Sequence, residues 1–246
     1  MRNVQSQAVS GHEGIAVKSV ALCAACYKGS EPEVVEAWTK MAFALGRQTN
    51  YKFKLFIAKR KRGELAANYA LHLMEEDERQ NGHRFTHVMW LDDDVVPDAA
   101  GTLKLLDAVD VHHPVVFALA FERDGQHKPA IWEGVYYGEY RVGIKQIFEY
   151  PENAMLRITA AGLCQAVFDR DVFDVLKKPY FDWVLPGYGR SSVTPDGYVC
   201  GKLEDVNIPV YCHTGIKVGH MRMPFPIDED YANHYRHLWE HTEVVR

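Results

Sequence analysis

Three consecutive aspartates, Asp92, Asp93 and Asp94, carry the strongest chemical signal in this sequence. They directly follow the apolar run Val88–Leu91 and so stand at the carboxyl end of a predicted strand, where open α/β sheets bind ligands. Successive side chains of an extended segment alternate in direction, so Asp92 and Asp94 can share one face while Asp93 turns toward the backbone or a helix. Clustered carboxylates repel one another unless they are protonated or bound to a cation such as Mg²⁺ or Mn²⁺. We therefore expect a divalent-metal site, in preference to a solvated turn that caps a helix at Asp98.

A basic run, Lys59–Arg62, follows a second apolar segment at Phe53–Ala58. In a parallel sheet this run lies at the same edge as the aspartates. Its arginines present planar forks of donors that suit a phosphate, of a nucleotide-sugar or of a nucleic acid. A solvated loop explains the same run equally well, and both interpretations stay open.

Among twelve histidines, His220 has the setting of a ligand, because it follows an apolar strand and its neighbour Gly219 permits close approach. Aromatic side chains between Trp132 and Tyr188 could stack on a sugar or a base, or belong to the core.

The amino-acid composition excludes several classes of protein function. Formal charge is −5 from 28 Lys and Arg against 33 Asp and Glu, which argues against a protein coated in basic residues. No apolar run reaches the ~18 residues of a membrane span, and residues 1–14 lack the pattern of a signal peptide, so we expect a cytoplasmic protein. Five scattered cysteines indicate no disulfide framework, and the Cys23–Cys26 pair has no second pair to complete a zinc site.

The elements that must position these residues alternate in the first half of the chain. Strands are predicted at Val17–Ala25, Phe53–Ala58, Thr86–Leu91 and Val115–Phe121. The helices between them run from a capping box at Ser30 and Glu33 to Gly46, from Glu64 to Glu78, and from Pro97–Asp98 to about Val109. This order favours a parallel, Rossmann-like sheet.

After Arg123 the alternation fails, and glycine-broken aromatic runs to Tyr150 indicate hairpins or loops. A strand over Arg157–Phe168 is predicted next, with a short helix at Asp171–Leu176. The segment Lys178–Thr194 is typical of a lid or acceptor loop. A helix from Pro195, a strand at Ile208–Cys212 and a helix from Asp230 complete the expected order, in one domain spanning 1–246.

Three stretches give a family resemblance. The run VMWLDDDVVPD resembles the DxD motif of GT-A glycosyltransferases, specifically family 2-like enzymes including compact forms found in bacteriophages. RITAAGLCQAVFDRDVFDVL resembles the strand, small-residue turn and helix that line the sugar pocket, with Gly162 at a close-approach position. TPDGYVCGKLEDVNIPVYCHTGIKVGHM resembles the acidic motif, helix, strand and terminal histidine that end the core. The resemblance covers about residues 17–221 and leaves a C-terminal tail, 222–246.

The resemblance implies an α/β GT-A domain with a mostly parallel sheet and a small antiparallel addition. It also implies roles: Asp196 as catalytic base, and Asp94, His220 and Asp92 around a divalent cation. Asp92 is also implied to contact the donor nucleotide, and the remaining donor-binding residues would be Tyr27, Arg62, Asn68 and Gly162.

Two departures from the family pattern leave alternatives open. The usual Glu-Asp pair is Pro195–Asp196 here, so Glu204 and Asp205 could be the acidic motif instead, although Asp196 precedes a helix of the right length. The usual Pro-x-Tyr after the first strand keeps only its aromatic, Tyr27.

The expected function is metal-dependent transfer of a sugar from a nucleotide-sugar, such as a UDP-sugar, to an acceptor hydroxyl with inversion. The acceptor could be phage DNA carrying a hydroxymethylated pyrimidine, in host cytoplasm, or else a glycan or a protein. Two alternatives remain: a nucleotidyltransferase, and a non-catalytic module that binds nucleotide or carbohydrate.

Overall fold

The computed structural model describes residues 17–27, 30–61, 63–123, 126–137, 140–184, 193–222 and 225–227. Its central sheet has seven strands in the order β2-β1-β3-β10-β5-β11-β8. Five of them run in one direction, whereas β10 and β8 run against their neighbours. The strands are β1 (Lys18–Cys26), β2 (Tyr51–Lys59), β3 (His87–Leu91), β5 (Val115–Leu119), β8 (Met155–Ile158), β10 (Gln165–Asp169) and β11 (Val210–Lys217).

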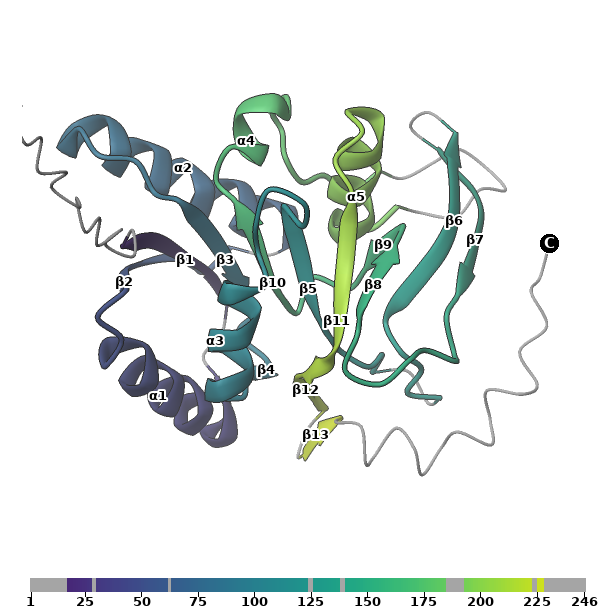
Figure 1. Cartoon of the computed structure of the whole chain (residues 1–246), viewed down its shortest axis with the longest axis horizontal. Coiled ribbons are helices and arrows are strands. Elements are labelled where there is room, and N and C mark those ends of the chain that lie inside the picture. Colours follow the sequence, from purple (N-terminus) through teal and green to yellow (C-terminus); the bar gives the residue numbers. More distant parts are fainter. Residues whose placement is uncertain are drawn as a thin grey trace, which may run out of the picture.

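Helices cover both faces of this sheet (Figure 1). One layer holds α2 (Gly63–Asn81), α4 (Val172–Val175) and α5 (Pro195–Asp205); the other holds α1 (Pro32–Gly46) and α3 (Ala99–Asp107). Strands β3 and β5 are therefore buried along their whole length, which explains why both are continuous apolar runs. Their carboxyl ends open on the same edge, and the acidic and basic candidates follow there.

Two small antiparallel sheets extend the domain. One joins β4 (Val95–Val96), β12 (Gly219–Arg222) and β13 (Phe225–Ile227); the other joins β6 (Ile131–Tyr137), β7 (Tyr140–Gln146) and β9 (Ala160–Ala161). The hairpin β6–β7 confirms the expectation for the glycine-broken stretch before Tyr150. The expected α/β class, with a mostly parallel sheet and an antiparallel addition, is confirmed.

The single strand expected over Arg157–Phe168 is wrong. The segment divides into β8 at one edge of the main sheet, β9 in a small sheet and β10 between β3 and β5. The small residues between Thr159 and Gly162 let the chain leave one sheet and enter another, and that change of direction has no signature in the apolar pattern.

The capping box at Ser30 and Glu33 is also wrong. Helix α1 begins at Pro32, and its N-cap residue Glu31 makes no side-chain capping hydrogen bond. Proline at the first helical position supplies the fixed φ angle that a helix start needs, so no capping side chain is required. At α3, by contrast, the Asp98 side chain accepts a hydrogen bond from the Gly101 amide.

Two expectations fall partly or wholly outside the described residues. The Lys178–Thr194 loop includes 185–192, and the helix expected from Asp230 belongs to 228–246. Within the part of the chain that the structure describes, no helix has the length and apolar character to cross a membrane.

Candidate active site

The acidic turn, Asp92–Asp94, lies between β3 and β4 and is anchored from three other segments. The amide of Asp92 donates to the Cys164 carbonyl at 3.1 Å, and the amide of Met221 donates to the Asp94 carbonyl at 2.7 Å. The Asp93 carboxylate accepts from the Tyr27 backbone amide at 2.8 Å. Asp93 therefore faces the backbone as the alternation of side chains predicted, and it braces the turn against β1.

Asp92 is held in a setting that disfavours its charge. Its Oδ1 accepts a hydrogen bond from the Trp90 indole N–H at 2.8 Å. Burial, together with the nearby Asp94 carboxylate, raises the pKa of Asp92 to about 7, and Asp196 adds to the rise. Asp92 thus titrates near neutral pH, which is the behaviour of functional carboxylates in clefts.

Asp94 faces two basic side chains, one at each oxygen. The His220 Nε2 lies 3.4 Å from Oδ1, and the Arg123 guanidinium pairs with Oδ2. Burial opposes the charge of Asp94, but the hydrogen bond from His220 and the charges of both partners prevail and lower its pKa. Burial disfavours the charged imidazolium and by itself lowers the pKa of His220. Cys164 and Asp94 outweigh burial and raise the pKa of His220 to about 11.

The donors around Asp94 suit a divalent ion in chemical type. The His220 Nδ1 lies 3.3 Å from the Phe121 carbonyl oxygen, and such a bond orients the other nitrogen of a metal-binding histidine. That other nitrogen faces the Asp94 carboxylate, with Asp92 close by. Across the described residues, however, no three His, Cys, Asp or Glu side chains are already gathered to hold an ion. The Arg123 guanidinium is paired with Asp94 Oδ2 instead.

A cleft of about 740 Å³ opens at this edge of the sheet. Trp90, Trp132, Trp183 and Phe121 give it aromatic walls, whereas Tyr180 and Phe181 from the expected stacking set are buried in the core. The charged and titratable side chains that line the cleft are Asp92, Glu122, Arg123, Cys164, Asp196 and His220.

The structure distinguishes the two possible registers of the acidic motif. Asp196 lies in the first turn of α5 and lines the cleft. Glu204 lies two turns further along the same helix, about 12 Å away by the helical rise, and lines a separate cavity of about 390 Å³. Asp196 is therefore the residue placed to act in the cleft, and its role as base stays a prediction.

Gly162 lines the cleft, and a Cβ atom there would lie 3.3 Å from the Ala130 Cβ; the close approach to a donor expected of it stays a prediction. Tyr27 is not part of the lining; its described contact with the turn is through its backbone amide. Arg62 lies outside the described residues. Of its neighbours, Lys61 lies 4.6 Å from the ring centroid of Tyr69.

The Asn68 side chain is hydrogen-bonded within the protein, and the donor contact expected of it stays a prediction. Its Nδ2 donates to the Phe181 carbonyl at 2.7 Å, and its Oδ1 accepts from the Tyr180 amide at 2.9 Å. Its neighbour Ala67 lines the cleft and Asn68 does not. Asn68 thus ties α2 to the segment that carries Trp183, a contact across 113 positions that no local pattern announces.

Arg123 is the functional candidate that the sequence analysis did not consider. It follows the apolar segment Val115–Phe121, so the rule that drew attention to the residues after β3 applies to it equally. A lone arginine before a glycine-rich stretch gave no further signal.

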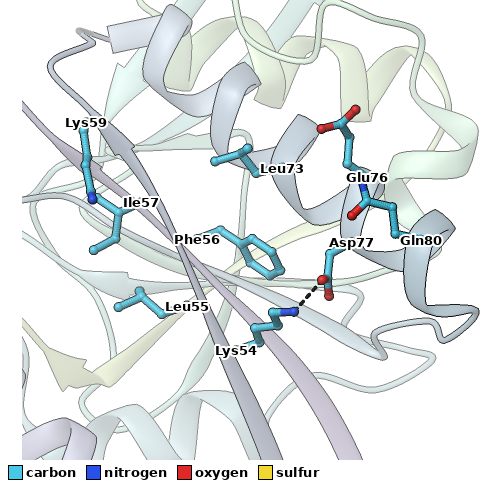
Figure 2. A pocket seen from close by; sticks show the side chains of 9 residues that line it. All are labelled: Lys54, Leu55, Phe56, Ile57, Lys59, Leu73, Glu76, Asp77 and Gln80. Carbon is cyan, nitrogen blue, oxygen red and sulfur yellow. Dashed lines mark hydrogen bonds and ion pairs between the residues drawn. The ribbon is translucent and has the colours of Figure 1, made fainter.

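A second cavity, of about 450 Å³, lies between β2 and α2 at the sheet edge and is called the edge groove here (Figure 2). Figure 2 shows Lys54 of β2 reaching Asp77 of α2 across it. The residues that line the edge groove are Lys54, Leu55, Phe56, Ile57, Lys59, Leu73, Glu76, Asp77 and Gln80.

No family model and no curated protein matches this chain. Among solved structures, A197 from STIV has a TM-score of 0.56 and 14% identity, over 83% of this chain and 86% of that one. The inositol-1-phosphate CTP transferase from T. maritima gives 0.44 and 12%, over 86% and 91%. A glycosyltransferase involved in glycosylation of the major capsid of PBCV-1 gives 0.32 and 10%, over 66% and 68%. The last two TM-scores are too low to establish a shared fold. The likeness to A197 supports the α/β fold alone.

Proposed function

We propose that this protein transfers a sugar from a nucleotide-sugar to an acceptor hydroxyl, with inversion at the anomeric carbon. The observation that carries the proposal is that Asp196, His220 and Asp92 of the acidic turn line one cleft of about 740 Å³. A base for the acceptor and a charged site for the donor are thus within reach of one substrate pair. The resemblance of the DxD, sugar-pocket and C-terminal segments to GT-A enzymes supports the same reaction.

The cleft offers complementary surfaces for the donor. Aromatic rings such as Trp132 and Trp183 can stack on a sugar or a nucleobase, and Gly162 leaves room for close approach. In this proposal Asp92 contacts the nucleotide ribose. The half-exposed Trp183 stands at the opening, where a ligand would cover it.

The cofactor in this proposal is Mn²⁺ or Mg²⁺, held by Asp94 and His220 with Asp92 nearby. When bound, such an ion neutralises charge that develops on a leaving diphosphate. His220 must give up a proton to coordinate, because its pKa is about 11, so ion binding is expected to release protons.

Asp196 performs the proton transfer in this proposal. Its carboxylate accepts the hydroxyl proton while the acceptor oxygen forms a bond to the anomeric carbon from the face opposite the diphosphate. The bond from that carbon to the diphosphate oxygen breaks, and the nucleoside diphosphate leaves with the electron pair. One displacement inverts the configuration.

For the acceptor we propose duplex DNA carrying a hydroxymethylated pyrimidine, with a glycan or a protein as the other outcomes. Lys59 at the end of β2, with Arg60 and Lys61 just after it, supplies positive charge in the stretch that leads to the cleft residue Gly63. The aromatic walls can receive a base that is rotated out of the duplex. Sugar transfer to hydroxymethylated but not to unmodified duplex of the same sequence tests this assignment.

Product analysis separates the proposed reaction from its alternatives. Glycosyl transfer releases a nucleoside diphosphate, whereas a nucleotidyltransferase acting on a nucleoside triphosphate and a sugar phosphate releases pyrophosphate. A binding module releases neither. Incubation with UDP-, GDP- and dTDP-sugars, with and without Mn²⁺, should yield nucleoside diphosphate from at least one donor, and failure with all of them contradicts the proposal.

A further inference from the structure

The ion pair between Arg123, which lines the cleft, and Asp94 has no role in the proposed reaction. Arg123 follows β5, Asp94 follows β3, and both segments end at the edge where the cleft opens. The Arg123 side chain is 50% exposed, against 31% for Asp94. The Arg123 guanidinium can therefore move away from the Asp94 carboxylate without leaving a buried environment.

This pair occupies the oxygen that a cation would need. Asp94 Oδ1 faces His220 and Oδ2 is bonded by Arg123, so each oxygen already has a basic partner. A divalent ion approaching Asp94 meets a fixed positive charge at contact distance, and the two cations repel each other. Occupation of the site by an ion thus requires the guanidinium to move.

A guanidinium displaced from Asp94 could bind a phosphate of the donor within the same cleft. Arginine presents two parallel N–H donors that match phosphate oxygens, and such charge-assisted bonds are stronger than neutral ones. In the proposed reaction the cleft receives the donor's diphosphate beside Asp94. The charge released from Asp94 would then be next to the phosphates.

We propose that Arg123 and a divalent cation compete for Asp94, and that the Arg123 guanidinium released by the cation binds a phosphate of the donor. The first half concerns ion binding alone; the second half rests on the proposed function. Arg123 is a binding residue in this scheme, and it makes ion uptake and donor capture favour each other.

The first test is titration calorimetry of Mn²⁺ into wild-type protein and Arg123→Gln. Glutamine is polar but shorter than arginine and carries no charge, so Mn²⁺ should bind about two- to fivefold more tightly, the range expected for a half-exposed ion pair. Arg79→Gln is the matched control, because Arg79 is an exposed arginine paired with Glu76 outside the cleft, and its Mn²⁺ affinity should equal that of the wild type. In an Asp94→Asn background, Arg123→Gln should no longer change Mn²⁺ affinity.

The second test is binding of uridine diphosphate and of inorganic pyrophosphate at saturating Mn²⁺. Arg123→Gln should weaken both by about tenfold, and Arg123→Lys, which keeps the charge but not the fork, should fall between. Unchanged or weaker Mn²⁺ affinity in Arg123→Gln, or no Mn²⁺ binding by either protein, overturns the competition. Unchanged diphosphate affinity overturns the second half. If wild-type protein binds neither phosphate ligand, the donor assignment fails, while the Mn²⁺ comparison still decides the competition.

Discussion

The cleft and the edge groove each contain a carboxylate paired with basic side chains, but the two regions use those charges differently. In the edge groove, Lys54 of β2 pairs with Asp77 of α2 (Figure 2). Asn81 donates to the same Asp77 oxygen at 2.7 Å. Helix α2 directly follows β2 in the chain, so this cluster ties neighbouring elements together. In the cleft, Asp94, Arg123 and His220 come from three separate segments.

The two regions differ in whether neighbouring carboxylates repel one another. The Asp77 Oδ1 finds its counter-charge in Lys54, whereas the buried Oδ2 has no hydrogen-bond partner among the described residues and lies 3.5 Å from the His83 Nε2. In the cleft, burial raises the pKa of Asp92 most, and the charges of Asp94 and Asp196 add to the rise; a cation or a donor group would offset that repulsion. A cavity lined by charged side chains is therefore weak evidence of a binding site. Carboxylates that converge at a sheet edge and repel one another are stronger evidence.

The largest expected effect is on turnover. Asp196→Asn keeps the shape of the side chain but removes the proton acceptor, so turnover should fall by about 10²–10⁴ while donor affinity persists. Glu204→Gln, on the same helix but outside the cleft, is the control and should retain near wild-type rates. Steady-state kinetics with donor-binding measurements decide this, and the reverse pattern would assign the acidic motif to Glu204.

The pH dependence of stability should be the next largest effect. Asp92 has a folded-state pKa of about 7 against an ordinary 3.8, so between about pH 4 and pH 7 the folded protein keeps a proton that the unfolded chain has lost. Its contribution to the free energy of unfolding therefore falls as pH rises through that window, by at most about 4 kcal/mol. Asp92→Asn retains an acceptor for Trp90 but carries no charge.

Urea denaturation of EDTA-treated protein checks this expectation. Asp92→Asn should match the wild type near pH 4 and exceed it near pH 8. Parallel pH profiles for the two proteins would show that the folded state does not disfavour the charge of Asp92. The contrast with the edge groove would then lose its electrostatic basis.

Metal affinity should change by an intermediate amount. Asp94→Asn removes the charge that attracts a cation but leaves the backbone bond from Met221 intact, so the fold should persist while Mn²⁺ affinity falls by about 100-fold. His220→Ala should cost less, because water can replace one neutral nitrogen ligand. Calorimetry measures both, and full activity in EDTA would contradict both assignments.

The smallest effect belongs to the edge groove. Asp77→Asn should lower the free energy of unfolding by about 1 kcal/mol, because it weakens a pair whose lysine is half exposed, and it should leave sugar transfer unchanged. Thermal melting and the transferase assay test the two halves. A loss of transfer without a loss of stability would make the edge groove a functional surface and remove the distinction drawn above.

Much of the fold and part of the site follow from local patterns. The runs that became β3 and β5 had to be apolar throughout because helices cover both of their faces, and this same pattern placed Asp92 and Arg123 at the ligand edge. Asp93 faces the backbone as expected, but it does so from a turn between β3 and β4 and not from an extended segment. The division of Arg157–Phe168 into three strands did not follow, because strand pairing depends on partners distant in the chain.

The sequence by itself determined the α/β order of the first half, the position of the acidic turn and the presence of a carboxylate at the start of α5. Tertiary structure alone decided which charges meet. Arg123 reaches Asp94 across 29 positions, and Asn68 holds Phe181 across 113. Local periodicity reports which face of an element is buried, whereas ion pairs and clefts depend on which strand ends are brought together. That outcome is set by the packing of the whole chain.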